Sequence, residues 1–171
     1  MNGLKFVFGI LLCLTFVVCV GIIGYKSEIQ FEQEIGGHMQ RAADANTVVL
    51  ATQEMETVLE NMRMNGYTHG YTTIISFLRT PDEDVGFWYE NMNASLGELK
   101  KVPQNSSQLE QSNVLMKLRE TLTNKGEQGS SVTVPSGISR FPNNFAWALA
   151  FWFTLVLFII GFVLIVKSLD E

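Results

Sequence analysis

Two long stretches without charge lie near the two ends of the chain. Phe6–Gly24 has nineteen residues and Phe145–Val166 has twenty-two, and neither contains Asp, Glu, Lys or Arg. A helix rises about 1.5 Å per residue, so a helix of either length crosses a hydrocarbon core about 30 Å thick. We therefore expect two transmembrane helices.

The first stretch also has features of a secretory signal peptide, because a short start with one lysine precedes it. Cleavage requires small residues at the third and first positions before the cut. The stretch ends in the triplets Cys-Val-Gly and Ile-Ile-Gly, which meet that requirement poorly. We expect it to remain as an uncleaved anchor.

The two stretches divide the chain into an N-terminal anchor (1–25), a central domain (26–144) and a second transmembrane helix with a short tail (145–171). The segment between the stretches carries ten Lys or Arg and fifteen Asp or Glu. It is long enough for one modest domain with its own core. Nucleic-acid binders need basic patches that displace phosphate counterions, so this acidic segment argues against that class of partner.

Lys5 precedes the first stretch and Lys167 follows the second. Positive charges close to a transmembrane segment favour the cytoplasmic side. The sequence thus predicts a two-pass protein of the cell membrane, plasma or inner. Both termini would be cytoplasmic and the central domain periplasmic or extracellular.

The first helix is expected to continue beyond Tyr25 as the pattern turns polar. Gly36 and Gly37 then predict an interruption, a kink or hinge, because adjacent glycines weaken a helix interior. From His38 to Asn65 the pattern predicts one helix that ends at Asn65-Gly66. Its apolar face would hold Val48, Ala51, Met55, Val58, Leu59 and Met62.

A helical hairpin is expected next. Thr80, Pro81 and Glu83 fit the start of a helix that ends before Pro103. A capping box at Ser107–Glu110 would open another helix with Gly126 as its C-terminal stop. The stripe of the first helix is Val85, Trp88, Met92, Leu96, Leu99 and Val102, and that of the second is Leu115, Leu118 and Leu122.

The runs in Gly66–Leu78 and Ser131–Val134 contain β-branched residues, and we expect them to pair as a small sheet. The predicted fold class is thus a mainly α membrane protein. Two transmembrane helices bracket a helical extramembrane domain, which consists of a long helix, a helical hairpin and a small two-stranded β element.

The sequence points to no catalytic set, and no cofactor or metal is expected. Histidine is scarce, since only His38 and His69 occur. One alternative places a metal between His69 and the acids of 82–84, although these acids also suit a helix start. Another makes His38 and Met39 haem ligands, but adjacent side chains on a helix point about 100° apart.

Two groups of residues are candidates for contact with a partner. Aromatic residues cluster near a predicted helix start, at Phe87, Trp88 and Tyr89, where core packing is the favoured role and a partner surface the second. In the transmembrane stretches, small residues permit close approach of helices and Trp152 adds aromatic surface. The small residues singled out are Gly21, Gly24, Ala146, Ala148 and Ala150.

These patterns favour a non-enzymatic membrane protein that acts by binding. It would be an accessory or structural subunit of a membrane assembly, and its partners would be the bilayer and other membrane subunits or further copies of itself. Because a transmembrane helix, a helical bundle and a second transmembrane helix follow in order, the chain also resembles the outer half of a bacterial chemoreceptor. That resemblance is one of topology, and it implies an extracytoplasmic ligand-sensing domain with a separate signalling partner. A small pore-forming protein and an enzyme are further alternatives.

Overall fold

The computed structural model describes residues 2–73, 75–103, 105–126, 129–138 and 145–170. The described chain is mostly helical, as the sequence predicts, and has one two-stranded sheet. It divides into two compact units. One combines Met1–Ser27 with Asn144–Glu171, and the other is Glu28–Asn143.

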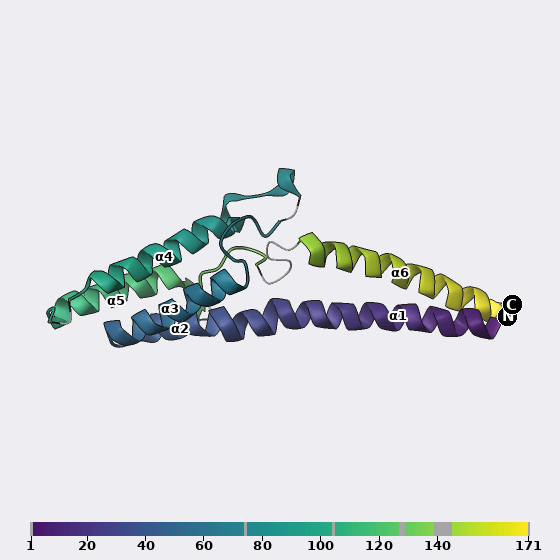
Figure 1. Ribbon diagram of the computed structural model, residues 1–171, viewed down its shortest axis with the longest axis horizontal. Coiled ribbons are helices and arrows are strands. Elements are labelled where there is room, and N and C mark those ends of the chain that lie inside the picture. Colours follow the sequence, from purple (N-terminus) through teal and green to yellow (C-terminus); the bar gives the residue numbers. More distant parts are fainter. Residues whose placement is uncertain (1, 74, 104, 127–128, 139–144, 171) are drawn as a thin grey trace. The chain divides into compact units, whose positions relative to one another are not determined.

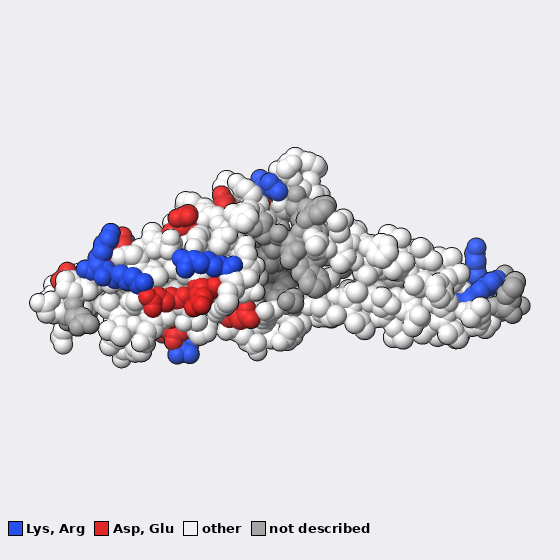
Figure 2. Space-filling model, in the orientation of Figure 1, with Lys and Arg blue, Asp and Glu red and all other residues white. Residues whose placement is uncertain are grey.

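The first unit consists of two apolar helices, α1 (Asn2–Gly24) and α6 (Phe145–Asp170), which lie side by side (Figure 1). Both are long and apolar enough to cross a membrane. On the face drawn in Figure 2, the charged side chains gather over the Glu28–Asn143 unit. The described surface of α1 and α6 is uncharged there except toward the chain ends.

Helical structure continues without interruption through Gly36 and Gly37, where an interruption is expected. Two π-helical segments, η1 (Tyr25–Gln30) and η2 (Glu32–Gly36), lead into α2 (Gly37–Asp44). Both glycines have ordinary right-handed helical backbone angles. A π-helical turn contains more residues than an α-helical turn, so the chain passes the two glycines and stays helical. A hinge at Gly36 and Gly37 stays a prediction.

The predicted single helix from His38 to Asn65 is wrong, because it is two helices. The backbone becomes extended at Ala45, and α3 (Val48–Met64) begins after Thr47, whose hydroxyl accepts a hydrogen bond from the Leu50 amide. This N-cap satisfies an amide that a new helix leaves free. The helices α2 and α3 therefore pack against each other as a hairpin. As predicted, Met55 and its neighbours on α3 are buried.

The next helix starts later than its sequence signal. Pro81–Glu83 forms only a 3₁₀ turn, η4, in which the Glu83 carboxylate accepts from the Thr80 amide. The α-helix α4 (Val85–Lys101) begins after Asp84, whose side chain accepts from the Phe87 amide. Thr80 and Asp84 are both N-cap residues in this segment, and α4 begins after the second of them.

The helix α5 (Gln108–Leu122) starts with Ser107 as its N-cap, as expected, but it ends before Gly126. Residues Thr123–Gly126 instead form β1, which pairs antiparallel with β2 (Gly129–Val132). The predicted pairing of Ser131–Val134 with the 66–78 run is thus wrong, although β2 overlaps the first of these runs. Closing the short connection between β1 and β2 costs less chain entropy than closing the long loop that the predicted pairing requires.

In the described part of 66–78, the structure has a 3₁₀ turn, η3 (Ser76–Leu78), and a single bridge between Tyr71 and Asp84. The core of the Glu28–Asn143 unit draws on the continuing first helix, α3, α4 and α5. Its largest fully buried side chains include Ile35, Met39, Met55, Leu59, Met92, Leu99 and Leu122.

Candidate functional site

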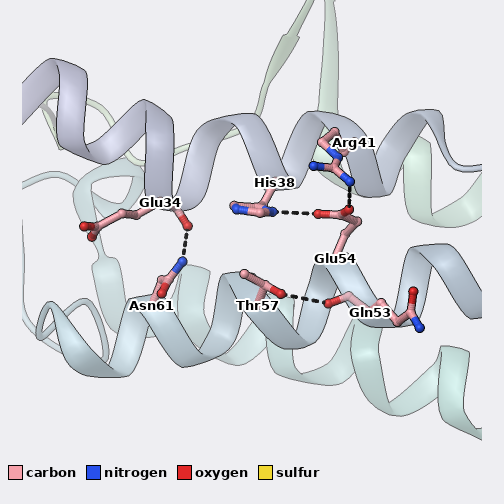
Figure 3. A network of polar contacts seen from close by, with 7 residues as sticks. All are labelled: Glu34, His38, Arg41, Gln53, Glu54, Thr57 and Asn61. Carbon is pink, nitrogen blue, oxygen red and sulfur yellow. Dashed lines mark hydrogen bonds and ion pairs between the residues drawn. The ribbon is translucent and has the colours of Figure 1, made fainter.

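A line of polar side chains joins the first helix to α3 (Figure 3). Glu54 is at its centre, and its side chain is only 14% exposed. One carboxylate oxygen lies 2.6 Å from His38 Nδ1, and the other lies 2.5 Å from Arg41 Nη2. Because two side chains of α2 meet one carboxylate of α3, this cluster fixes how the two helices pack.

The same line continues around Glu34. Asn61 Nδ2 donates to the Glu34 carbonyl at 2.5 Å, and Asn65 Nδ2 donates to the Glu34 carboxylate at 2.7 Å. Nearby, burial raises the pKa of the Tyr67 phenol above 10.0, and the Glu34 charge raises it further. These polar groups hold helices together, which is a structural role.

Each of the two histidines has a polar neighbour in the structure. His38 meets Glu54, whereas Met39 is fully buried in the apolar core. The His69 Nδ1 atom lies 2.9 Å from the Thr68 hydroxyl. Among the residues that the structure describes, no three His, Cys, Asp or Glu side chains gather closely enough to hold a metal ion.

The three aromatic candidates on α4 have different surroundings. Trp88 is 5% exposed, stacks near Phe31 and donates through Nε1 to the Thr133 carbonyl at 3.1 Å, so it belongs to the core. The Tyr89 hydroxyl is 2.8 Å from Arg63 Nε, which donates to it. Phe87 is 66% exposed and is thus available to a partner.

An open hollow of about 490 Å³ lies beside Phe87. Tyr71, Arg79 and Asp84 also line it. The Arg79 guanidinium lies 5.0 Å from the centre of the Tyr71 ring, a cation–π distance. The hollow therefore combines apolar rings with one cation and one carboxylate.

The contact between α1 and α6 is built on two glycines that the sequence reasoning missed. Gly9 and Gly161 are buried. A Cβ atom at Gly9 would lie 2.7 Å from the Gly161 carbonyl oxygen, so only glycine permits this approach. Phe16 adds ring contacts at 4.9 Å from Phe158 and 6.2 Å from Phe151.

Of the small residues predicted to mediate helix contacts, only Ala148 is buried. Gly21, Gly24 and Ala146 are exposed, Ala150 is half-buried and Trp152 is 61% exposed. Except for Ala148, these residues thus contribute mainly to the outer surface of their helices. The first stretch contains three glycines, Gly9, Gly21 and Gly24, and the second contains only Gly161. The sequence does not indicate which of the three faces Gly161.

A second feature that the sequence reasoning missed is a group of exposed apolar side chains. It consists of Phe77 and Leu78 on η3 and of Ile75, the residue before η3. The β-branched residues of the 66–78 run favour a strand. The signal that points away from a strand is the nearby Arg79-Thr80-Pro81, which starts a turn shortly after the exposed Phe77.

Comparison of the chain with models of protein families, with curated proteins and with solved structures finds no match.

Proposed function

We propose that the chain is a two-pass integral membrane protein in which α1 and α6 cross the bilayer. The observation that carries this proposal is the apolar surface that the α1–α6 pair leaves exposed. Both helices bear large apolar side chains that stay more than half exposed, such as Leu4, Phe153 and Phe162. Water strongly disfavours such a surface, and lipid or apolar partner helices would cover it.

In this proposal the termini lie in the cytoplasm, and the Glu28–Asn143 unit lies in the periplasm or outside the cell. Lys5 and Lys167 support this orientation, because each flanks an apolar helix on the terminal side. The charged unit then stays in water, while the uncharged helices stay in lipid (Figure 2).

We further propose that the protein acts without catalysis, as a subunit of a membrane assembly formed with other membrane subunits or with further copies of itself. The supporting residues are Gly21, Ala146 and Trp152, which the helix pair leaves exposed. A Cβ atom at Gly21 would meet no other atom within 4 Å, so the backbone is open to a neighbouring helix. Close helix approach of this kind is a principal source of association in membranes.

The test is extraction of tagged protein from its native membrane in mild detergent, followed by sizing and mass spectrometry. We expect a defined assembly, either with a stoichiometric companion or of several copies. Gly21→Leu should reduce the assembled fraction. Gly3→Leu is the matched control, because Gly3 is also open but lies near the chain end. A monomer without companions would contradict the assembly.

A ligand-sensing domain is the second candidate, and the hollow beside Arg79 and Phe87 favours it. Its volume of about 490 Å³ falls in the range of small-molecule sites, which is about 300–1,000 Å³. A small molecule that binds there should raise the melting temperature of the chain. Replacement of the cation by Arg79→Gln should abolish that rise for an anionic ligand.

A further inference from the structure

The most exposed large apolar side chain that the structure describes is Phe77, at 84%. It lies on η3 between Ile75, 49% exposed, and Leu78, 55% exposed. These three side chains, which we name the apolar turn, sit on one tight bend in which the Leu78 amide donates to the Ile75 carbonyl at 3.0 Å. Three neighbouring apolar side chains exposed together indicate a surface that another apolar phase covers.

Polar contacts hold both ends of the apolar turn. Arg79 Nε donates to the Thr73 carbonyl at 3.1 Å, and the Thr73 hydroxyl donates to the Glu83 carboxylate at 2.7 Å. The same carboxylate accepts from the Thr80 amide at 3.1 Å. The base of the turn is thus fastened, and the apolar side chains are presented at its tip.

The base of the turn is fastened close to the segment that leads to α6. The Thr72 hydroxyl donates to the Ser136 carbonyl at 2.5 Å, and the Ser136 amide donates to the Asp82 carbonyl at 3.2 Å. Phe145, where α6 begins, is nine positions after Ser136 in the sequence. An extended chain covers at most about 3.5 Å per residue, so the start of α6 lies within about 30 Å of Ser136.

The chain enters the unit from α1 shortly before Phe31. The ring of Phe31 packs edge-on against Tyr67, with 5.8 Å between the ring centres, and Tyr67 is four residues before Tyr71. Phe31 is seven residues after Gly24, the end of α1, which corresponds to about 10 Å of helix. Two short segments therefore join the unit to the apolar helices.

We propose that the apolar turn inserts into the interfacial layer of the same bilayer that α1 and α6 cross, so that the unit rests on the lipid surface. This inference rests on the membrane anchoring proposed above. Phe, Ile and Leu enter the boundary between headgroups and acyl chains, and the adjacent Arg79 keeps its charge among the headgroup phosphates.

Apolar area drives this insertion, since the net charge of the unit opposes binding to anionic lipid. The segment between the two apolar helices carries fifteen acidic and ten basic residues. A negatively charged membrane surface repels such a domain. Insertion should therefore occur in neutral phosphatidylcholine vesicles, and anionic lipid should not strengthen it.

The experiment uses the full chain with Cys13→Ala and Cys19→Ala and a nitroxide spin label at Ser76→Cys. Ser76 is exposed within the turn, so the label leaves the three apolar side chains intact. The matched control is Ser112→Cys on α5. It lies in the first turns of α5, which follow the C-terminal end of α4, and the seventeen residues of α4 extend about 25 Å. A third label at Ile160→Cys reports whether α6 is in the bilayer.

Each chain is reconstituted in phosphatidylcholine vesicles, and collisions of the label with oxygen and with a water-soluble nickel chelate are measured. We expect the Ser76 label to lie about 5–10 Å below the surface, with more oxygen and less nickel contact than the Ser112 label. Adding Phe77→Asp to the Ser76→Cys chain should return the label to the aqueous values.

Three results would overturn the proposal. If the Ile160 label is deep while the Ser76 label matches the Ser112 label, the insertion is wrong and the membrane anchoring stands. If the Ile160 label is also aqueous, the anchoring fails, and the insertion fails with it. If the Ser76 label is shielded from both reagents in detergent as well as in vesicles, a protein surface and not lipid covers the turn.

Discussion

Tyr67 links the stability of the Glu28–Asn143 unit to alkaline pH. Burial and the Glu34 charge raise the pKa of its phenol above 10.0. The unfolded chain therefore releases this proton at lower pH than the folded chain does. The contribution is fully present below about pH 10 and is lost as the pH rises through the raised pKa.

Tyr67→Phe should remove this dependence, because phenylalanine keeps the ring contact with Phe31 and has no proton to release. We expect the melting temperature of the variant, followed by circular dichroism, to fall less between about pH 9 and about pH 11 than that of the original chain. Parallel falls in the two chains would show that Tyr67 does not carry the effect.

Glu54 is the residue whose loss should most weaken the packing of α2 on α3. Glu54→Ala leaves His38 and Arg41 without their shared carboxylate, and we expect a loss of about 1–3 kcal/mol in the free energy of unfolding. Glu56→Ala is the control. Its pair with Lys100 is half exposed on both sides, and such pairs contribute about 0–1 kcal/mol. Equal losses in denaturant unfolding would contradict the central role of Glu54.

At the scale of elements, periodic apolar stripes predicted the helices well, because burial of one face follows directly from residue spacing. The positions at which helices start and end are harder to predict from sequence. Thr47 and Asp84 both start helices through side-chain caps, yet nearby glycines and Pro81 carry stronger sequence signals. The hairpin of β1 and β2 was missed because four polar residues after α5 look like the end of a helix until a partner strand pairs with them.

The α4–α5 hairpin gives the sharpest test at this scale. Leu99 and Leu118 are buried at its contact, so truncation of either to alanine should cost about 2–5 kcal/mol. Leu109→Ala is the control, because Leu109 is exposed at the start of α5. Unfolding of the full chain in detergent, monitored by circular dichroism, would measure all three. Similar small losses at the three sites would mean that the hairpin core is placed wrongly.

For the whole molecule, the two apolar helices were predictable from length and absence of charge alone. The residues at which they meet were not, because helix register depends on contacts between distant parts of the chain. The same reason explains why the sequence treats Phe87 and Trp88 as one cluster, whereas in the structure Trp88 is a core residue and Phe87 beside it is exposed. Adjacent residues on a helix point about 100° apart, so one of the two faces the core and the other faces outward.

The central claim is that α1 and α6 both cross the bilayer, so that the unit and the two termini lie on opposite sides. The most direct measurement is labelling of intact cells with a membrane-impermeant maleimide, using chains with Cys13→Ala and Cys19→Ala. We expect Ser112→Cys to react in intact cells, and Leu169→Cys near the C-terminus to react only after the membrane is opened. Reaction of both positions in intact cells, or of neither, would contradict the account.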